Sequence, residues 1–299
     1  MSSKTIIIIC GPTAVGKTAA AIELAQSLNT QIISADSRQC YCELNIGVAK
    51  PGPRELVAVK HYFINSHRVH EPVDAAIFET YALHAAKQIF EINDVAIMVG
   101  GTGLYIKAFA EGLDDIPPID IDIRREIMNS LQANGLAWLQ EQIIKHDPAF
   151  WQIAEQQNPQ RLMRGLEVFL STGKSIITFR KEGKKQRPFN IIKAGIELPR
   201  PELNERINKR VDAMIENGLI TEVESLLRYQ HINALQTVGY RELFDYFSGN
   251  ISLEKAIENI KTNTRHYAKR QMTWFRKDVG IHWFSPNNFA AGLAALHAN

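Results

Sequence analysis

Residues 6–18 read IIIICGPTAVGKT, an apolar β-branched run followed by a glycine-rich turn and a lysine. The run Ile6–Cys10 is typical of a buried strand in a parallel sheet, because such strands are covered on both faces. The segment Gly11–Thr18 matches G-x-x-x-x-G-K-[ST] at every specified position. Apolar residues then recur with helical spacing from Ala21 to Leu28. Strand, turn and helix together predict a phosphate-binding loop at the start of an α/β domain.

The loop Gly11–Thr18 has the residue types that a bound diphosphate requires. Its glycines let backbone N–H groups converge on phosphate oxygens, and the following helix adds the positive end of its dipole. We expect Lys17 to hold terminal phosphate oxygens and Thr18 to be a ligand of Mg²⁺. The predicted diphosphate-binding residues of the loop are Gly11, Thr13, Ala14, Val15, Gly16, Lys17 and Thr18. The loop alone does not identify which phosphate compound binds, or whether phosphate is transferred.

Strands and helices alternate along much of the chain, which predicts an α/β fold with a parallel sheet. Further strands are expected at 31–34, 61–65, 95–99, 191–198 and 282–284. Long helices are expected at 200–229 and 253–277. Prolines and aspartates near 114–118 mark a boundary, after which the sequence is mostly helical. We therefore divide the chain into a core at 1–115, a helical insertion at 116–195, and a continuation of the core with a basic helix at 196–299.

The composition excludes several classes of protein. With 45% hydrophobic and 22% charged residues, the 299-residue chain is not of a disordered or coiled-coil type. A net charge of +2 identifies no partner. Three cysteines give neither a disulfide framework nor a four-ligand zinc site, and no apolar run approaches a membrane span. We expect a cytoplasmic protein without membrane contact, and a monomer.

Two polar turns follow predicted strands: the polar turn at 35–41 and the glycine turn at 100–105. Both should face the same crevice as the loop, because ligands bind outside the carboxyl ends of parallel strands. Asp36 could bind Mg²⁺ or accept a proton, and Gln39 has the amide that a nucleobase edge requires. The alternative for this segment is an Asx turn or a helix cap. In the turn Gly100–Tyr105, the Thr102 hydroxyl could bond a substrate. The alternative there is a tight turn with a capping threonine.

Basic residues gather on two predicted helices. Arg161 and Arg164 share one helical face. Four cations on the last long helix form a stripe, which would suit a polyanion, or would be an ordinary solvated face. These are Lys261, Arg265, Lys269 and Arg276. Trp274 points away from this stripe, so we expect it in the core.

Several of these segments occur in a fixed order that is specific to one family. They are GPTAVGKT at 11–18, DSRQCY at 36–41, IGVAKP at 46–51, GGTGLY at 100–105, NPQRLMRGLEV at 158–168, RINKRVDAMIENGLITEV at 206–223, VGYR at 238–241 and KRQMTWFR at 269–276. The chain resembles the tRNA dimethylallyltransferase (tRNA isopentenyltransferase) family of bacterial type, over about residues 5–285. The resemblance implies a P-loop core like that of nucleotide kinases, with an insertion domain that contacts tRNA.

The resemblance also implies a reaction. Dimethylallyl diphosphate, held in place of ATP, donates its five-carbon group to N6 of the adenosine 3′-adjacent to the anticodon, and pyrophosphate leaves. Asp36 would be the general base, and Thr102 would contact the base or the diphosphate. Lys17, Arg210 and Mg²⁺ on Thr18 would neutralise the pyrophosphate. The residues implied to contact tRNA are Asp36, Ser37, Arg38, Gln39, Thr102, Arg124, Gln160, Arg161, Leu162, Met163, Arg164, Gly239, Tyr240, Arg241, Lys269, Arg270, Gln271, Trp274 and Arg276.

Three other functions are compatible with parts of the sequence. An adenylate isopentenyltransferase would prenylate free AMP, ADP or ATP, but it would not need an extended cationic stripe. A P-loop small-molecule kinase would consume ATP and transfer phosphate. A non-catalytic RNA-binding module would be indifferent to loss of the Asp36 carboxylate. Assays of the acceptor, of phosphate transfer and of an Asp36 variant distinguish these functions.

Overall fold

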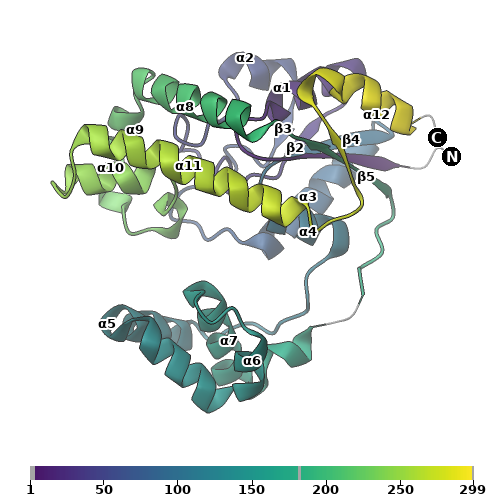
Figure 1. The fold of residues 1–299 in the computed structure, drawn as a ribbon. Helices are drawn as coiled ribbons and strands as arrows, with labels where there is room; N and C mark the ends of the chain where they lie inside the picture. Colours follow the sequence, from purple (N-terminus) through teal and green to yellow (C-terminus); the bar gives the residue numbers. More distant parts are fainter. Residues whose placement is uncertain (1–3, 181–182, 298–299) are drawn as a thin grey trace. The chain divides into compact units, whose positions relative to one another are not determined.

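A computed structural model describes residues 4–180 and 183–297 of the chain. These residues form two compact units, shown in Figure 1. The core unit comprises Met1–Gly112 and Gln186–Asn299, and the insertion unit comprises Leu113–Lys185. The predicted end of the insertion at 195 is therefore corrected to 185. The reason is that residues 190–196 form a strand that pairs with the first strand of the sheet.

The core unit is built on one sheet of six strands, as the sequence predicts. The strands are β1 Thr5–Cys10, β2 Ile32–Ser34, β3 His61–Tyr62, β4 Val95–Val99, β5 Asn190–Ile196 and β6 Ile281–Phe284. Their order is β3-β2-β4-β1-β5-β6, and every pairing is parallel. Ile6 of the central strand β1 lies between Ala96 of β4 and Ile191 of β5. The P-loop therefore leaves the middle of the sheet.

The isoleucine run of β1 supplies both faces of this sheet. Side chains alternate along a strand, so Ile6 and Ile8 join one buried cluster while Ile7 and Ile9 join the other. The first cluster is shared with the helices Ala75–Phe90 and Gly103–Glu111, and the second with the helices Lys17–Ser27 and Phe289–His297. A run that is apolar at every position is what a strand with helices on both faces requires.

Helices of the core unit cover both faces of the sheet. They are α1 Lys17–Ser27, α2 Pro53–Ala58, α3 Ala75–Phe90, α4 Gly103–Glu111, α8 Arg200–Glu216, α9 Leu219–Ser225, α10 Tyr240–Phe247, α11 Leu253–Phe275 and α12 Phe289–His297. The predicted helix 253–277 is confirmed. The predicted single helix 200–229 is wrong, because Gly218 has φ +96° and separates α8 from α9. The sequence analysis did not predict α10 or α12.

The insertion unit is helical, as expected. It contains α5 Ile121–His146, α6 Pro148–Ile153 and α7 Pro159–Thr172. Its own buried cluster includes Leu139, Phe150, Leu162 and Leu166. The Asn158 side chain accepts a hydrogen bond from the Arg161 N–H at 3.3 Å and so caps α7, with Pro159 at its first position.

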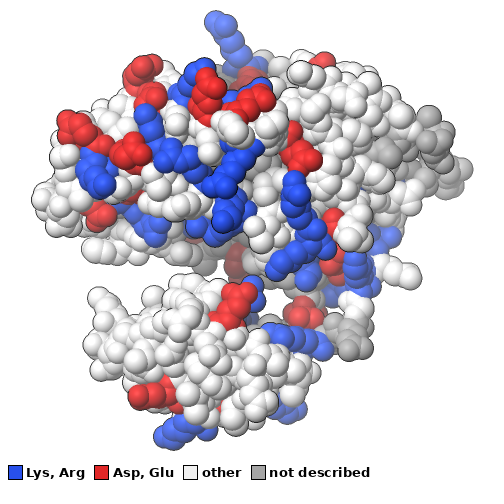
Figure 2. All heavy atoms as spheres, in the orientation of Figure 1, with Lys and Arg blue, Asp and Glu red and all other residues white. Residues whose placement is uncertain are grey.

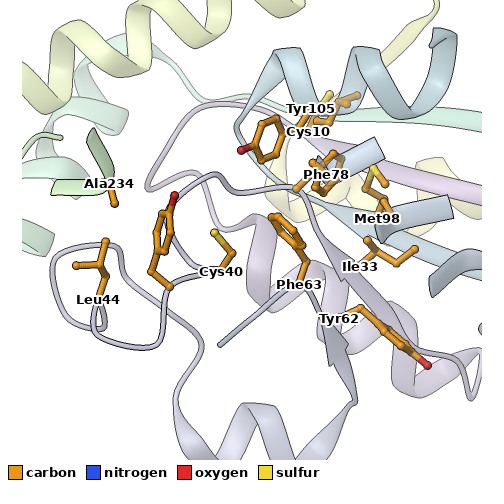
Figure 3. Packing of buried hydrophobic residues seen from close by; sticks show 14 of the residues in the cluster. Cys10, Ile33, Cys40, Leu44, Tyr62, Phe63, Phe78, Met98, Tyr105 and Ala234 are labelled. Carbon is orange, nitrogen blue, oxygen red and sulfur yellow. The ribbon is translucent and has the colours of Figure 1, made fainter. Parts of the chain in front are cut away.

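An aromatic cluster supports the two polar turns of the core unit (Figure 3). Phe78 stacks on Tyr105 with ring centroids 4.5 Å apart, and Phe63 meets Phe78 edge-on at 5.0 Å. Tyr105 lies in the first turn of the helix Gly103–Glu111, which follows the glycines at 100 and 101, and Cys40 of the other polar turn is buried in the same cluster. Burial raises the pKa of the Cys40 thiol to about 12, so this cysteine acts as a small apolar side chain. The cluster gives both turns a rigid base.

Candidate active site

The P-loop depends on backbone conformations that its residue types permit. Gly11 has φ +139°, and a Cβ there would lie 2.3 Å from the Ile196 carbonyl oxygen of β5. Gly16 has φ +105° at the start of α1, and Ala14 has φ +66°. Val15 is fully buried and anchors the loop in the core. The loop is thus bent around the space in front of α1 by its own sequence.

Two partly buried cations, Lys17 and Arg210, lie beside this loop. The Lys17 Nζ donates to the Pro12 carbonyl oxygen at 2.6 Å, and Arg210 donates to the Thr13 hydroxyl at 3.3 Å. Burial and then the charge of Arg210 lower the pKa of Lys17 to about 8, although Asp36 opposes this shift. Burial also lowers the pKa of Arg210. Because one cation disfavours the other, an anion bound here would relieve both.

A cavity of about 490 Å³ opens at the loop and is strongly cationic. Its charged lining consists of Lys17, Lys50, Arg206, Lys209, Arg210 and, as the one acid, Glu55. The Glu55 carboxylate accepts a hydrogen bond from the Gly52 N–H at 2.7 Å. Thr18 also lines the cavity. Its volume and charge suit a diphosphate.

Asp36 forms the Asx turn considered above. Its Oδ1 accepts hydrogen bonds from the N–H groups of Arg38 at 2.8 Å and Gln39 at 3.2 Å. Burial lowers the pKa of Lys17 and of Arg210, and the charge of Asp36 opposes this lowering at both groups. The Asx turn therefore fixes the carboxylate through Oδ1, and its negative charge acts on both cations of the P-loop.

Thr102 connects the glycine turn to the polar turn. Its Oγ1 accepts a hydrogen bond from the Ser37 N–H at 3.0 Å, and its own N–H donates to the Ala35 carbonyl at 3.2 Å. Gly100 is required because a Cβ would lie 2.2 Å from that carbonyl oxygen. The Thr102 hydroxyl can still donate a hydrogen bond, because the Ser37 N–H occupies only one lone pair of its oxygen. Asp36 and Thr102 are thereby held on adjacent turns.

The Gln39 amide bonds within the protein, and the expectation that it also holds a nucleobase stays a prediction. Its Nε2 donates to the carbonyls of Val48 at 3.2 Å and Ala49 at 3.1 Å, and its Oε1 accepts from the Ser34 hydroxyl at 3.2 Å. Both hydrogens of the Gln39 side-chain amide therefore have acceptors in the segment 45–51. Gln39 shapes the wall of the cavity, where Ala49 and Lys50 lie.

Four other residues implied to contact tRNA have buried side chains, and Gly239 is buried as well. They are Leu162, Met163, Tyr240 and Gln271, with exposures of 0%, 7%, 0% and 6%. Leu162 and Met163 belong to the core of the insertion unit. These residues lie in segments that also carry exposed cations, so the motif alone could not separate the buried face of a helix from its exposed face.

Glu222 is a positioning residue that the sequence reasoning missed. Its carboxylate accepts hydrogen bonds from the N–H groups of Ile46 at 2.8 Å and Gly47 at 3.0 Å, and from the Tyr240 hydroxyl at 2.6 Å. It therefore holds the segment 45–51 from the side opposite Gln39. A single glutamate on a helix has no spacing signal that could have revealed this role.

Tyr267 on α11 was also missed. The residue is 36% exposed, but burial of its hydroxyl end and then the charge of Asp36 raise the pKa of the phenol, and the hydroxyl is hydrogen-bonded to the Gln271 side chain. Trp274, one helical turn beyond Arg270, is 37% exposed and lies against Gly103, where a Cβ would come within 2.1 Å of the indole Nε1. The expectation that Trp274 lies in the core is wrong.

The remaining residues implied to contact tRNA lie on or near the surface of their own units. In the insertion unit, Arg161 pairs with Glu155 at 3.3 Å, while Arg124 and Arg164 share the buried Glu167 at 3.5 and 3.4 Å. Gln160 is exposed beside them. In the core unit the exposed residues are Arg241, Lys269, Arg270 and Arg276. Ser37 and Arg38 are partly exposed, whereas Gly239 is buried.

Ion pairs partly neutralise the cationic stripe on α11. Lys261 contacts Asp212 at 2.6 Å, and Arg276 contacts Glu197 at 2.8 Å. Arg265 donates to Asn208 of α8 at 2.7 Å. Figure 2 shows Lys and Arg side chains over α8 and α11 with acids among them. The solvated-face alternative therefore accounts for part of the stripe.

The donor set at the P-loop fits Mg²⁺ held with a phosphate ligand. Among residues 4–180 and 183–297, no group of three or more His, Cys, Asp or Glu side chains could enclose a metal ion. Mg²⁺ in phosphate-transfer sites needs no such enclosure, because it keeps water and phosphate oxygens as ligands. Thr18 offers a hydroxyl at the cavity wall. In the same described part of the chain, every helix is too short or too polar to cross a membrane.

Comparison with known proteins finds relatives over almost the whole chain. A family model described as "IPP transferase" matches residues 39–278. A tRNA dimethylallyltransferase of Christiangramia forsetii is 47% identical over 94% of this chain and 93% of its own length. One from Bacteroides thetaiotaomicron is 43% identical over 94% and 92%.

Solved structures agree with this similarity. The tRNA isopentenylpyrophosphate transferase of Bacillus halodurans is 36% identical and superposes with a TM-score of 0.69, covering 94% of this chain and 90% of its own. A eukaryotic dimethylallyltransferase, described as acting on tRNA, is 27% identical with a TM-score of 0.80, covering 98% and 78%. The two-unit architecture is thus shared with enzymes whose chains are similar along their length.

Proposed function

The chain belongs to the IPP transferase family, and from this premise we propose that it transfers a dimethylallyl group from dimethylallyl diphosphate to N6 of the adenosine 3′-adjacent to the anticodon in tRNA. Pyrophosphate is the leaving group. Relatives named as tRNA dimethylallyltransferases, alike over more than nine-tenths of the chain, support the reaction class. The observation that carries the proposal is the pair of partly buried cations Lys17 and Arg210 in the wall of a cationic cavity, both influenced by the charge of Asp36.

The donor diphosphate would lie in the cavity at the P-loop. Lys17 and Arg210 would bind its oxygens and stabilise the negative charge that grows on pyrophosphate as the carbon–oxygen bond breaks. Mg²⁺, when held by Thr18 and the phosphate oxygens, would add positive charge to the same leaving group. The remaining donors would be the P-loop backbone N–H groups, since Gly11, Ala14 and Gly16 bend the chain around this space.

The acceptor adenine would enter beside Asp36. Its amine can reach a carboxylate on a recessed turn only after the base leaves its stack, and extrusion from a single-stranded loop costs roughly a few kcal/mol. Asp36 would accept one proton from N6 as N6 bonds to the allylic carbon. The Asx turn fixes the carboxylate through Oδ1. The Thr102 hydroxyl would donate a hydrogen bond to the base or to the diphosphate.

Recognition of tRNA would use exposed cations on each unit. On the core unit these are Arg241, Lys269, Arg270 and Arg276, with Trp274 available for stacking on a base. On the insertion unit they are Arg124, Arg161 and Arg164. Phosphate contacts of this kind position an RNA without reading its sequence.

We also propose that the protein acts as a cytoplasmic monomer. Its three cysteines form no disulfide framework, which suits a reducing compartment. A single elution volume that stays constant over a wide range of protein concentrations would support the monomer.

The direct test is mass spectrometry of nucleosides from an unmodified tRNA incubated with enzyme, Mg²⁺ and dimethylallyl diphosphate. We expect one adenosine to gain a five-carbon unit, with pyrophosphate released in equal amount. Prenylation of AMP in preference to tRNA would instead establish an adenylate isopentenyltransferase. Transfer of the γ-phosphate of ATP would establish a kinase. The Asp36→Asn variant is the matched negative control, because its side-chain oxygen can still accept the bonds of the Asx turn.

A further inference from the structure

Gln271 joins three separate segments of the core unit through one buried amide. It lies on α11 and is 6% exposed. Its Oε1 accepts a hydrogen bond from the Thr13 N–H of the P-loop at 2.9 Å. Its Nε2 donates to the Gly101 carbonyl oxygen at 2.9 Å. The two backbone partners fix which end of the amide is oxygen and which is nitrogen.

Gly101 allows this amide to approach the backbone closely. A Cβ on Gly101 would lie 2.2 Å from the Gln271 Nε2, so a larger residue there would displace the amide. Gly101 directly precedes Thr102, whose hydroxyl holds the polar turn that carries Asp36. Gln271 is therefore one hydrogen bond away from the P-loop and one residue away from the proposed catalytic turn.

The hydrogen bond to Thr13 also determines which N–H groups of the P-loop are left to bind a phosphate. The Thr13 N–H is occupied by Gln271, so it does not point freely toward a phosphate. The Thr13 hydroxyl in turn accepts from Arg210. The role of Thr13 is thus to connect Gln271 with one of the two cations of the donor site, which refines its predicted role as a direct diphosphate ligand.

We propose that Gln271 is a positioning residue for the prenyl transfer. Its amide holds the P-loop and the Thr102 turn in fixed positions relative to each other, so that the allylic carbon of the donor lies next to the adenine N6 whose proton Asp36 accepts. The inference rests on the proposed function. Only a side chain with one acceptor and one donor at this length satisfies both partners, since glutamate has no donor when ionised and methionine has neither.

The exposed face of α11 carries residues that are proposed to contact tRNA. Lys269, Arg270 and Trp274 flank Gln271 in sequence and are exposed. Trp274 also lies against Gly103 of the glycine turn. A helix that carries the proposed RNA contacts on its outer face is thus bonded to the donor loop on its inner face.

The test compares Gln271→Glu and Gln271→Met with wild type. Binding of pyrophosphate with Mg²⁺ is measured by calorimetry, tRNA binding by fluorescence anisotropy, and kcat and KM by nucleoside analysis. We expect kcat to fall about 10²-fold in both variants, a size typical of reacting groups displaced by about 1 Å. Pyrophosphate affinity should fall most in Gln271→Met, which leaves the Thr13 N–H unpaired, and tRNA affinity should stay within about twofold.

Two controls separate positioning from lost stability. Ile260→Val removes a methylene from a buried side chain on the same helix, about three turns before Gln271 and outside its hydrogen bonds. It should lower the melting temperature but leave pyrophosphate affinity and kcat unchanged. Thr273→Ala alters an exposed hydroxyl that bonds within the helix to Lys269, and should change nothing. Gly101→Ala, which displaces the amide from the other side, should reproduce the loss in kcat.

The outcomes distinguish the inference from the function on which it rests. If the Gln271 variants lose tRNA affinity and keep pyrophosphate affinity, Gln271 is an RNA contact and the inference is wrong. If they lose only melting temperature, as in Ile260→Val, the amide is merely structural. If wild type binds no pyrophosphate, the proposed function itself fails. If tRNA is not the acceptor but pyrophosphate binding still depends on Gln271, the positioning role stands and only the acceptor is reassigned.

Discussion

The cations of the P-loop and the arginines of the insertion unit are held in opposite ways. Lys17 and Arg210 are partly buried, and burial lowers the pKa of each, with the charge of Arg210 lowering that of Lys17 further. Arg124 and Arg164 are exposed, with side-chain exposures of 55% and 40%, and share the buried carboxylate of Glu167. Buried cations gain most from a bound anion, whereas exposed cations paired with an acid add affinity in small steps. Substitutions in the two regions should therefore differ in size and in the constant they change.

The largest effect is expected for Asp36→Asn. Loss of a general base should lower kcat by about 10²–10⁴-fold. Binding of tRNA should change little, because the Asx turn can persist. Single-turnover rates at saturating tRNA measure the effect. A variant with near wild-type kcat would show that Asp36 is not the proton acceptor. Substitutions near the P-loop would then not have the larger effect on kcat that is expected relative to the insertion unit.

Arg210→Met should have the next largest effect. A lost electrostatic contact to the leaving group is expected to lower kcat/KM by about 10²–10³-fold. Lys209→Met is the matched control, because this neighbour lines the same cavity but is exposed and paired with Glu205 at 2.6 Å. Similar losses in both variants would mean that general positive charge matters there, and not the buried position of Arg210.

Arg124→Ala and Arg164→Ala should weaken tRNA binding without changing kcat at saturating tRNA. Each lost phosphate contact should reduce the slope of log affinity against log salt concentration by about one. Arg125→Ala is the control, since Arg125 is exposed and pairs with Asp122 at 3.1 Å, away from Glu167. Equal losses for all three arginines would argue that Glu167 gives its two partners no special role.

The smallest effect concerns pH. Because burial lowers the pKa of Lys17 to about 8, the free enzyme loses this positive charge as the pH rises above that value. Diphosphate binding then requires uptake of a proton, so affinity should fall as the pH rises, by up to about tenfold per pH unit well above 8. Below pH 7 the affinity should level off with respect to this group. Calorimetry with pyrophosphate measures it, and Lys17→Met should bind weakly with little pH dependence.

The donor loop could be predicted from sequence because its function is local. A β-branched strand, glycines that permit positive φ, and Lys17 on the first turn of a helix lie within thirteen consecutive residues. The parallel sheet followed from the same kind of pattern, since apolar runs reveal buried strands. The ends of elements were less certain: Gly218 divides a helix that periodicity extends to Tyr229.

The tertiary structure alone decided which motif residues face a ligand and which face the core. Gln39, Tyr240 and Gln271 stand in motifs that resemble a tRNA-binding family, yet their polar groups bond to the protein itself. The sequence could place them near the site but not orient them, because orientation depends on partners up to 258 residues away. Short-range stereochemistry thus set the phosphate loop, and long-range hydrogen bonding set how the loop, Asp36 and α11 are held together.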